Sequence, residues 1–175
     1  ETSTFYAQKY RLSSEDRLAT LRLADFGAQT IYSFPAFIAE EFSARYDQFR
    51  MFHHIHAWLS ALYYQTQHLN KEVIYLHIQE SVFDIAVIKK SQLQFCNAYR
   101  YNNPEDILYF VMHVYQSYRL QAEQHELYYT GSNTQLKAIL SLLKTYVRNV
   151  QEVSLYALPD PGIHNNPVFL LQHCV

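Results

Sequence analysis

The second half of the chain predicts an α/β fold built on a mixed five-stranded sheet. Three short apolar segments follow one another with tight turns between them, as in an antiparallel meander. Two segments with helical periodicity then alternate with two further strand-like segments. Helical crossovers join parallel strands, so the predicted order is strand, strand, strand, helix, strand, helix, strand.

The three strands of the meander are rich in β-branched and aromatic residues. Two-residue turns separate them, at Glu80-Ser81 and at Lys90-Ser91. Such short connections permit only antiparallel pairing. The predicted strands cover residues 73–79, 82–89 and 92–99.

A helix-start signal follows the meander. Asn103 can cap the helix, Pro104 suits its first position, and Glu105 and Asp106 favour the positive end of the helix dipole. Apolar residues then recur at helical spacing, and the helix is expected to end near Gln121.

The remaining elements alternate in the same way. A short strand over residues 126–130 ends at Gly131, and Asn133 or Thr134 is expected to cap a second helix. The final strand is predicted over residues 150–158, before a Pro-Asp-Pro-Gly turn.

The first 70 residues are less regular. The predicted elements are a helix over residues 14–23, a strand over 29–34, a helix over 35–46, and a strand over 52–58 that runs into a helix over 59–67. Their order matches the closing portion of the second half without its opening meander. We therefore expect residues 1–70 to hold part of a first unit, and residues 71–175 to hold a complete second unit with a C-terminal tail.

Two segments carry a resemblance to a known group of proteins. The hairpin over residues 77–87 reads HIQESVFDIAV, and it resembles the D-L-G-G-G-T-F-D-V-S-I pattern of actin-like and sugar-kinase-like ATPases. In this match Phe83-Asp84-Ile85 correspond to F-D-V. The segment LYYTGS, at residues 127–132, resembles the region where these proteins place a G-G turn against adenosine.

The chain is therefore similar to an uncharacterised Bacteroidetes family of proteins with an actin-like ATPase fold. It resembles more distantly the actin-like scaffolds of type IV pilus and type II secretion machines. The resemblance implies an actin-like ATPase fold made of ribonuclease H-like units.

The departures from the ATPase pattern concern the residues that hold phosphate. In the family the first Asp helps to organise the metal and water, and three glycines expose backbone N–H groups to phosphate. Side chains replace these glycines here, and an acidic one at ~4 Å from a phosphate charge costs about 4 kcal/mol at an effective dielectric constant near 20. The degenerate phosphate hairpin comprises His77, Gln79, Glu80, Ser81 and Asp84, and the degenerate adenosine turn comprises Gly131 and Ser132.

Other signals for catalysis or cofactor binding are weak. The chain has three glycines, few for loops that wrap backbone around phosphate. It has no P-loop, G-x-G-x-x-G, H-E-x-x-H or G-x-S-x-G motif. We therefore expect no cofactor, no ATP affinity and no ATPase activity.

Four histidines and one aspartate remain as candidates for chemistry. His53, His54 and His56 have no neighbouring cysteine, and the nearest acid is at residue 47, so we expect polar positions at a strand edge and no metal site. His77 is either a remnant acid or base or a buried, hydrogen-bonded histidine. Asp84 could pair with His77 across the hairpin as a general base, or bond to turn backbone or to an arginine.

Composition excludes two classes of partner. The net charge is −2 without clusters of Lys and Arg, which argues against nucleic acid binding. No apolar stretch approaches the ~20 residues of a membrane span, and the first residues do not resemble a signal peptide. Cys96 and Cys174 lack metal or redox spacing, so we expect reduced thiols and a cytoplasmic location.

The 16 Tyr and 11 Phe residues suit either a core or a surface that faces a partner. The sequence is interpreted as a non-catalytic pseudo-ATPase scaffold or protein-binding module with a protein partner, with homo-oligomerisation left open. One alternative is a nucleotide-binding protein or enzyme with a rebuilt cleft, for which His77, Glu80, Asp84 and Ser132 are the candidates. An envelope-associated assembly protein is another.

Overall fold

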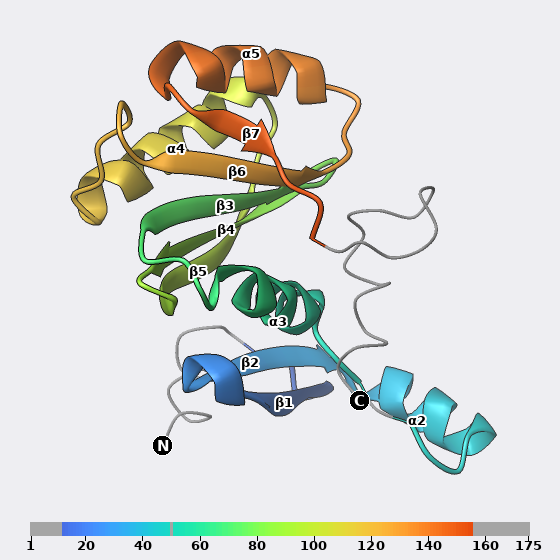
Figure 1. Ribbon diagram of the computed structural model, residues 1–175. Helices are drawn as coiled ribbons and strands as arrows, with labels where there is room; N and C mark the ends of the chain where they lie inside the picture. The colour runs from blue at the N-terminus through green and yellow to red at the C-terminus, as the bar shows by residue number, and fades with distance from the viewer. Residues whose placement is uncertain (1–11, 50, 156–175) are drawn as a thin grey trace.

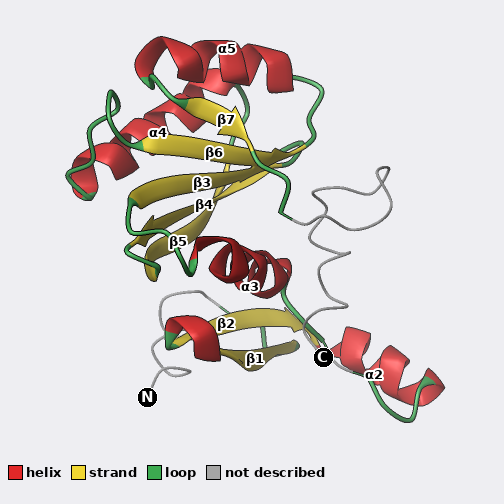
Figure 2. Ribbon diagram, in the orientation of Figure 1, coloured by secondary structure: helices red, strands yellow, loops and turns green. Residues whose placement is uncertain are grey.

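A five-stranded sheet lies between two helical layers, and a separate two-stranded hairpin lies beyond one of these layers (Figure 1, Figure 2). The structure is a computed structural model that describes residues 12–49 and 51–155. The order of elements in the second half agrees with the prediction from sequence.

The large sheet has the order β5-β4-β3-β6-β7. Its first three strands pair antiparallel as a meander, and the last two run parallel to β3. The strands are β3 (Glu72–Ile78), β4 (Val82–Lys89), β5 (Gln92–Arg100), β6 (Glu126–Gly131) and β7 (Val150–Glu152). The last strand is shorter than predicted, and residues 156–158 of that prediction lie outside the described residues.

Helices α4 (Pro104–Ser117) and α5 (Leu136–Tyr146) cover one face of the sheet (Figure 1). The predicted start of α4 is confirmed, because the Asn103 side chain accepts a hydrogen bond from the Asp106 backbone in a capping box. The helix ends before the predicted Gln121, and Arg119 adopts a left-handed φ of 54° just after it.

The start of α5 differs from the prediction. Its N-cap is Gln135, and no side chain caps it. The Asn133 side chain instead accepts a hydrogen bond from the Gln135 backbone within the preceding turn. The residues expected to cap this helix therefore belong to the loop that joins β6 to α5.

Helix α3 (His54–Thr66) covers the opposite face (Figure 1). Trp58 and Leu62 are fully buried there against Val73 and Tyr75 of β3. Successive side chains of a strand point to opposite faces of a sheet. Because Val73 and Tyr75 face α3, the next odd-numbered residue of β3, His77, also lies on that face.

The N-terminal region corrects one predicted helix. Residues 14–23 do not form a helix: β1 (Asp16–Leu23) pairs antiparallel with β2 (Ala28–Pro35) along its whole length. Leucines in so short a segment fit a strand as well as a helix, and pairing with a partner strand decides between them. The turn η1 (Ala24–Phe26) joins the two strands. The helix predicted after the second strand is present as α2 (Ala36–Arg45).

The strand predicted over residues 52–58 is also wrong, because α3 already begins at His54. Seven residues of α3 are buried, and they lie on most sides of the helix. A helix that is apolar all round shows no clear apolar repeat of 3.6 residues, so its sequence does not indicate a helix. The described order in this region is thus strand, strand, helix, helix. The division into a partial first unit over residues 1–70 and a complete second unit over residues 71–175 stays a prediction.

Gly131 allows the ends of β3 and β6 to approach one another. Its φ is 102°, and a Cβ atom added there would lie 2.1 Å from the backbone oxygen of Ile78. Packing within the sheet therefore explains why residue 131 is a glycine, and no ligand is needed to explain it.

We predict that Gly131→Ala lowers the free energy of unfolding by more than about 2 kcal/mol, since it adds a backbone clash to an unfavourable φ. Urea denaturation would measure the change. Gly27→Ala is the matched control: its φ is 62° with no atom near the added Cβ, so it should cost about 1–2 kcal/mol. Equal costs for the two variants would contradict the proposed clash.

Candidate functional site

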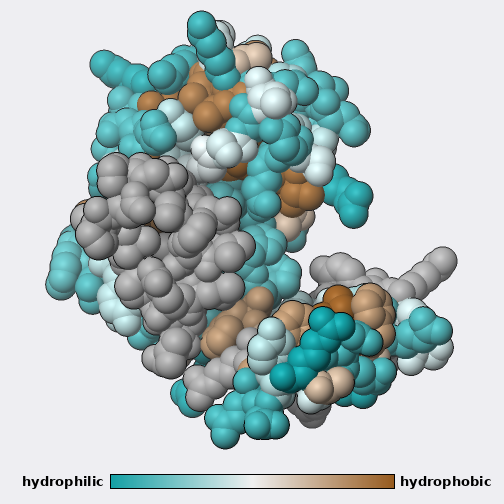
Figure 3. Space-filling model, turned by 90° about the vertical axis from the view of Figure 1, so that its right-hand side faces the viewer, coloured by the Kyte–Doolittle hydropathy of each residue, from teal (hydrophilic) through white to brown (hydrophobic). Residues whose placement is uncertain are grey.

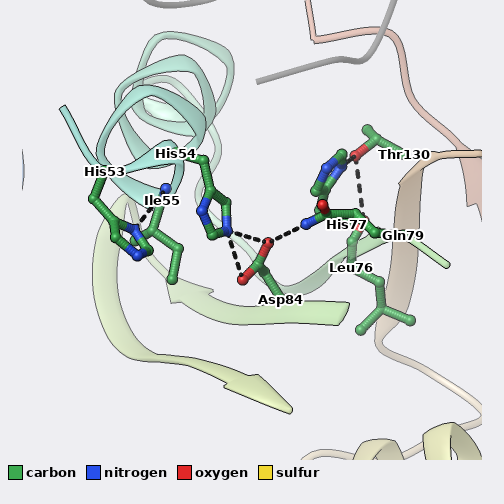
Figure 4. Close-up of polar contacts among 8 residues, drawn as sticks. All are labelled: His53, His54, Ile55, Leu76, His77, Gln79, Asp84 and Thr130. Carbon is green, nitrogen blue, oxygen red and sulfur yellow. Dashed lines mark hydrogen bonds and ion pairs between the residues drawn. The ribbon is translucent and has the colours of Figure 1, made fainter. Parts of the chain in front are cut away.

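A buried carboxylate lies at the centre of a polar cluster between α3 and the large sheet (Figure 4). The Asp84 side chain is fully buried, and both of its oxygens contact His54 Nε2, at 3.2 and 3.0 Å. The Gln79 side-chain amide donates a weaker hydrogen bond at 3.4 Å. Among the residues that the structure describes, Asp84 therefore bonds to an imidazole and an amide, and not to turn backbone or an arginine as the sequence suggested.

His54 is placed by the start of α3. It is the first residue of the helix, and its side chain keeps 35% exposure while its Nε2 reaches the buried carboxylate. A carboxylate accepts hydrogen bonds, so His54 Nε2 carries a proton and donates it in the contact with Asp84. Residues 52–58 were predicted to form a strand, so the His54–Asp84 pair was not predicted from the sequence.

His77 is buried on the same face and bonds elsewhere. Its Cα atom is paired with that of Asp84 across the hairpin, but its Nδ1 lies 3.0 Å from Thr130 Oγ1. The Thr130 hydroxyl in turn donates to the Leu76 backbone oxygen at 3.4 Å (Figure 4). Because the Thr130 hydroxyl hydrogen is used in this contact with Leu76, His77 Nδ1 donates the hydrogen bond to Thr130 Oγ1. His77 thus matches a buried, hydrogen-bonded histidine, and the hydrogen bonds of Asp84 go to His54 and Gln79.

Burial lowers the pKa of His77 to about 4, and the opposing negative charge of Asp84 does not offset this. Burial also lowers the pKa of His53, with a smaller contribution from the neighbouring His54. His53 Nδ1 accepts a hydrogen bond from the Ile55 backbone and so caps α3 in its neutral form (Figure 4). The residues expected at a strand edge therefore serve the start of a helix.

No group of three or more potential metal ligands occurs within residues 12–49 and 51–155. Burial raises the pKa of the Cys96 thiol to about 12, and the charge of Asp84 acts in the same direction. Cys174 lies outside the described residues. The cluster therefore offers the Asp84 carboxylate, the His54 imidazole bonded to it, and the imidazoles of His53 and His77, whose pKa values are lowered by burial.

The degenerate phosphate hairpin is bonded directly to the two residues that follow the degenerate adenosine turn. Glu80 Oε1 accepts from the Thr134 backbone at 3.0 Å, and Glu80 Oε2 accepts from the Thr134 hydroxyl at 3.0 Å and from Asn133 Nδ2 at 3.3 Å. The Glu80 carboxylate thus takes the hydrogen-bond donors of the facing loop. We call residues 79–81 and 131–134 the loop pair.

Three further hydrogen bonds, two of them from Tyr101, support the loop pair. The Gln79 backbone oxygen accepts hydrogen bonds from Asn133 Nδ2 at 2.9 Å and from the Tyr101 hydroxyl. The Ser81 backbone oxygen accepts from the Tyr101 backbone at 3.1 Å. The side chains of Ser81 and Ser132 remain exposed. Sequence reasoning named the two loops but missed Tyr101, and it assigned Asn133 and Thr134 to helix capping because their partner Glu80 lies more than 50 residues away.

The arrangement of strands and helices defines a class of protein. The structure is similar to a crystal structure from Bacteroides thetaiotaomicron VPI-5482, described as a protein with actin-like ATPase fold and unknown function. The TM-score is 0.85, with 15% sequence identity over 99% of this chain and 65% of that chain. It is also similar to the PilM–PilN type IV pilus biogenesis complex, with a TM-score of 0.61 and 11% identity over 88% of this chain and 61% of that chain. The protein has an actin-like ATPase fold, as the sequence resemblance implied.

A family model described as "Protein of unknown function (DUF3822)" matches residues 1–150. The chain belongs to this family. No curated protein matches the sequence. The chain spans less than two thirds of the length of either similar structure. None of the helices in the described part of the chain has the length and apolar character needed to cross a bilayer.

The buried His77 makes stability depend on pH. The unfolded chain protonates this imidazole near its ordinary pKa of 6.5, but the folded protein does so only near 4. The free energy of unfolding should therefore fall as the pH is lowered through this interval, by up to about 3 kcal/mol. Denaturation at a series of pH values should show that His77→Asn flattens the dependence while His113→Gln, at an exposed position, does not. An unchanged slope in His77→Asn would contradict this assignment.

The His54–Asp84 pair should show coupling in a double-mutant cycle. His54→Ala leaves the buried carboxylate with only the Gln79 amide, and we expect a loss of about 1–3 kcal/mol in the free energy of unfolding. Asp84→Asn in the same background removes the unpaired charge and should recover part of that loss. If the effects of the two substitutions were simply additive, the pair would have no structural importance.

Proposed function

We propose that the protein is a non-catalytic member of the actin-like fold that acts as a scaffold or protein-binding module. The observation that carries this proposal is the position of Glu80. Its carboxylate accepts three hydrogen bonds from Asn133 and Thr134 across the loop pair. In the ATPases that the sequence resembles, the corresponding loops present backbone N–H groups to a nucleotide.

Electrostatics and geometry both oppose a phosphate in the loop pair. A phosphate there would meet the negative charge of Glu80, and within the described residues no Lys or Arg forms an ion pair with Glu80. It would also have to displace a carboxylate from the Thr134 backbone and hydroxyl. Both requirements lower affinity for a polyphosphate.

Exposed aromatic side chains on α2 and the residues after it support contact with a protein. Phe37, Phe42, Tyr46 and Phe49 are between 37% and 62% exposed. The Phe42 ring packs with those of Tyr46 and Phe49, at centroid distances of 6.0 and 5.7 Å. Figure 3 looks onto the side of the molecule where α2 lies, and in the lower part of this view apolar residues lie next to polar ones. Aromatic residues are enriched in protein interfaces.

A second candidate function is an enzyme with a rebuilt site, and the His54–Asp84 pair is the observation that favours it. A buried carboxylate that fixes one imidazole nitrogen leaves the other as a general base. His54 keeps partial exposure, as such a base would require. Of the four residues named from sequence for this alternative, Asp84 belongs to the pair and His77 bonds to Thr130. Glu80 and Ser132 lie in the loop pair and form no hydrogen bond to His54 or Asp84 among those described.

The proposed function predicts no measurable affinity for nucleotide. Isothermal titration of the full chain with Mg-ATP and Mg-ADP should give no saturable heat at ligand concentrations up to about 100 μM, and phosphate release should equal the buffer rate. A dissociation constant of that size corresponds to about 5.5 kcal/mol of binding free energy, well within detection.

The unmodified chain and the His54→Ala variant together separate the two candidate functions. Saturable binding by the unmodified chain would refute the non-catalytic proposal. Nucleotide turnover that His54→Ala abolishes would establish the enzyme instead.

A further inference from the structure

A surface pocket of about 590 Å³ lies between α4 and α5, on the side of the sheet opposite the His54–Asp84 pair. Leu108 and Met112 form its inner wall and pack against the core of the domain. Tyr109 and Tyr146 line it from the two helices, and Glu105 adds a carboxylate. Figure 1 shows the two helices side by side on this face.

The helical repeat brings these side chains together. Residues three and four positions apart share a helix face, so Glu105, Leu108, Tyr109 and Met112 lie along one side of α4. Tyr146 is the last residue of α5 and reaches the same pocket. The fully buried residues of α4 are different ones, and the stripe has a partly buried side at Leu108 and Met112 and an exposed side at Glu105 and Tyr109.

The tyrosines are unusually exposed for their size. Tyr109 is 66% exposed and Tyr146 is 54% exposed. His113 lies beside Tyr109 with its ring almost parallel, at 8°, and a centroid distance of 6.4 Å. Their ring faces therefore border an open pocket with an apolar inner wall, a type of surface that marks binding sites.

The charge of the pocket selects a cation. Glu105 is exposed and forms no ion pair with another described residue, and no Lys or Arg lines the pocket. Tyrosine ring faces attract cations electrostatically, and the carboxylate adds a directional hydrogen-bond acceptor. A neutral apolar ligand would gain nothing from this exposed carboxylate.

We propose that this pocket binds an arginine side chain carried on an apolar segment of a protein partner. Arginine fits better than lysine because its planar guanidinium group stacks on tyrosine and bonds a carboxylate through two N–H groups. Leu108 and Met112 contact the apolar residues beside the arginine, and a methionine adapts to side chains of different shape. The assignment rests on the proposed role as a protein-binding module and names the chemistry of its partner.

The two methionines of the chain provide a specific measurement. Met112 lies in the pocket, whereas Met51 lies near β2, where its backbone oxygen accepts from Tyr32. With ¹³C-methyl methionine in the full chain, titration with N-butylguanidinium should shift the Met112 signal saturably and leave the Met51 signal unchanged. N-butylurea is a neutral molecule of nearly the same shape, and it should bind at least about tenfold more weakly.

A peptide tests whether the pocket prefers an arginine carried by a protein partner over a small guanidinium ion. A short helical peptide with one arginine among leucines should bind more tightly than N-butylguanidinium, because its apolar side chains add contacts with the inner wall. The same peptide with citrulline in place of arginine keeps the shape without the charge and should lose at least about tenfold in affinity. Equal affinity of the peptide and N-butylguanidinium would overturn the assignment to a protein partner.

Variants complete the test. Glu105→Gln and Tyr109→Leu should each weaken binding of the arginine peptide severalfold, while Tyr109→Phe, which keeps the ring, should retain it. Tyr64→Leu, at a 54% exposed position on α3, is the control and should change nothing. Backbone amide spectra confirm that each variant is folded. An unshifted Met112 signal, or equal binding of the charged and neutral probes, would refute the pocket without affecting the nucleotide result.

Discussion

The close approach of β3 to β6 at Gly131 is the constraint on which the rest of the site depends. The Gly131 backbone lies so near Ile78 that no other residue fits. This contact fixes the loop after β6 against the turn of the β3–β4 hairpin, within reach of Glu80 and Gln79. Packing thus explains the glycine of the segment that resembles an adenosine turn, and Asn133 and Thr134 after it form hydrogen bonds within the chain.

The other face of the hairpin depends on a single buried charge. Asp84 is fully buried, and the position of α3 provides its main partner, His54. An unpaired carboxylate in such a place would be costly, so this contact fixes where α3 begins on the sheet. His77 and His53 are held neutral by burial in the same cluster. The cluster therefore ties α3 to the large sheet and makes the stability of the protein sensitive to acid.

Sequence reasoning predicted the second half well because each element there carries its own local signal. Asn103 and Pro104 mark the start of α4, and the turn at Glu80-Ser81 separates two clearly apolar strands. It failed where the decision depends on distant partners. Leu18 to Leu23 became a strand through pairing with β2, and the helix at His54 is buried on most sides, which conceals its period. His54, the main partner of Asp84, lies 30 residues away, and the partners of Glu80 lie more than 50 residues away, so no spacing rule could find them.

We infer that the loop pair closes on itself and leaves no place for a phosphate. NMR tests this directly by following the backbone amide signals of residues 79–81 and 132–134 while Mg-ATP is added to the full chain. These signals should stay unchanged, and in particular the Thr134 amide should keep the shift of a hydrogen bond to Glu80. A saturable change centred on these residues would instead show that a nucleotide displaces Glu80 and that the loop pair accepts phosphate.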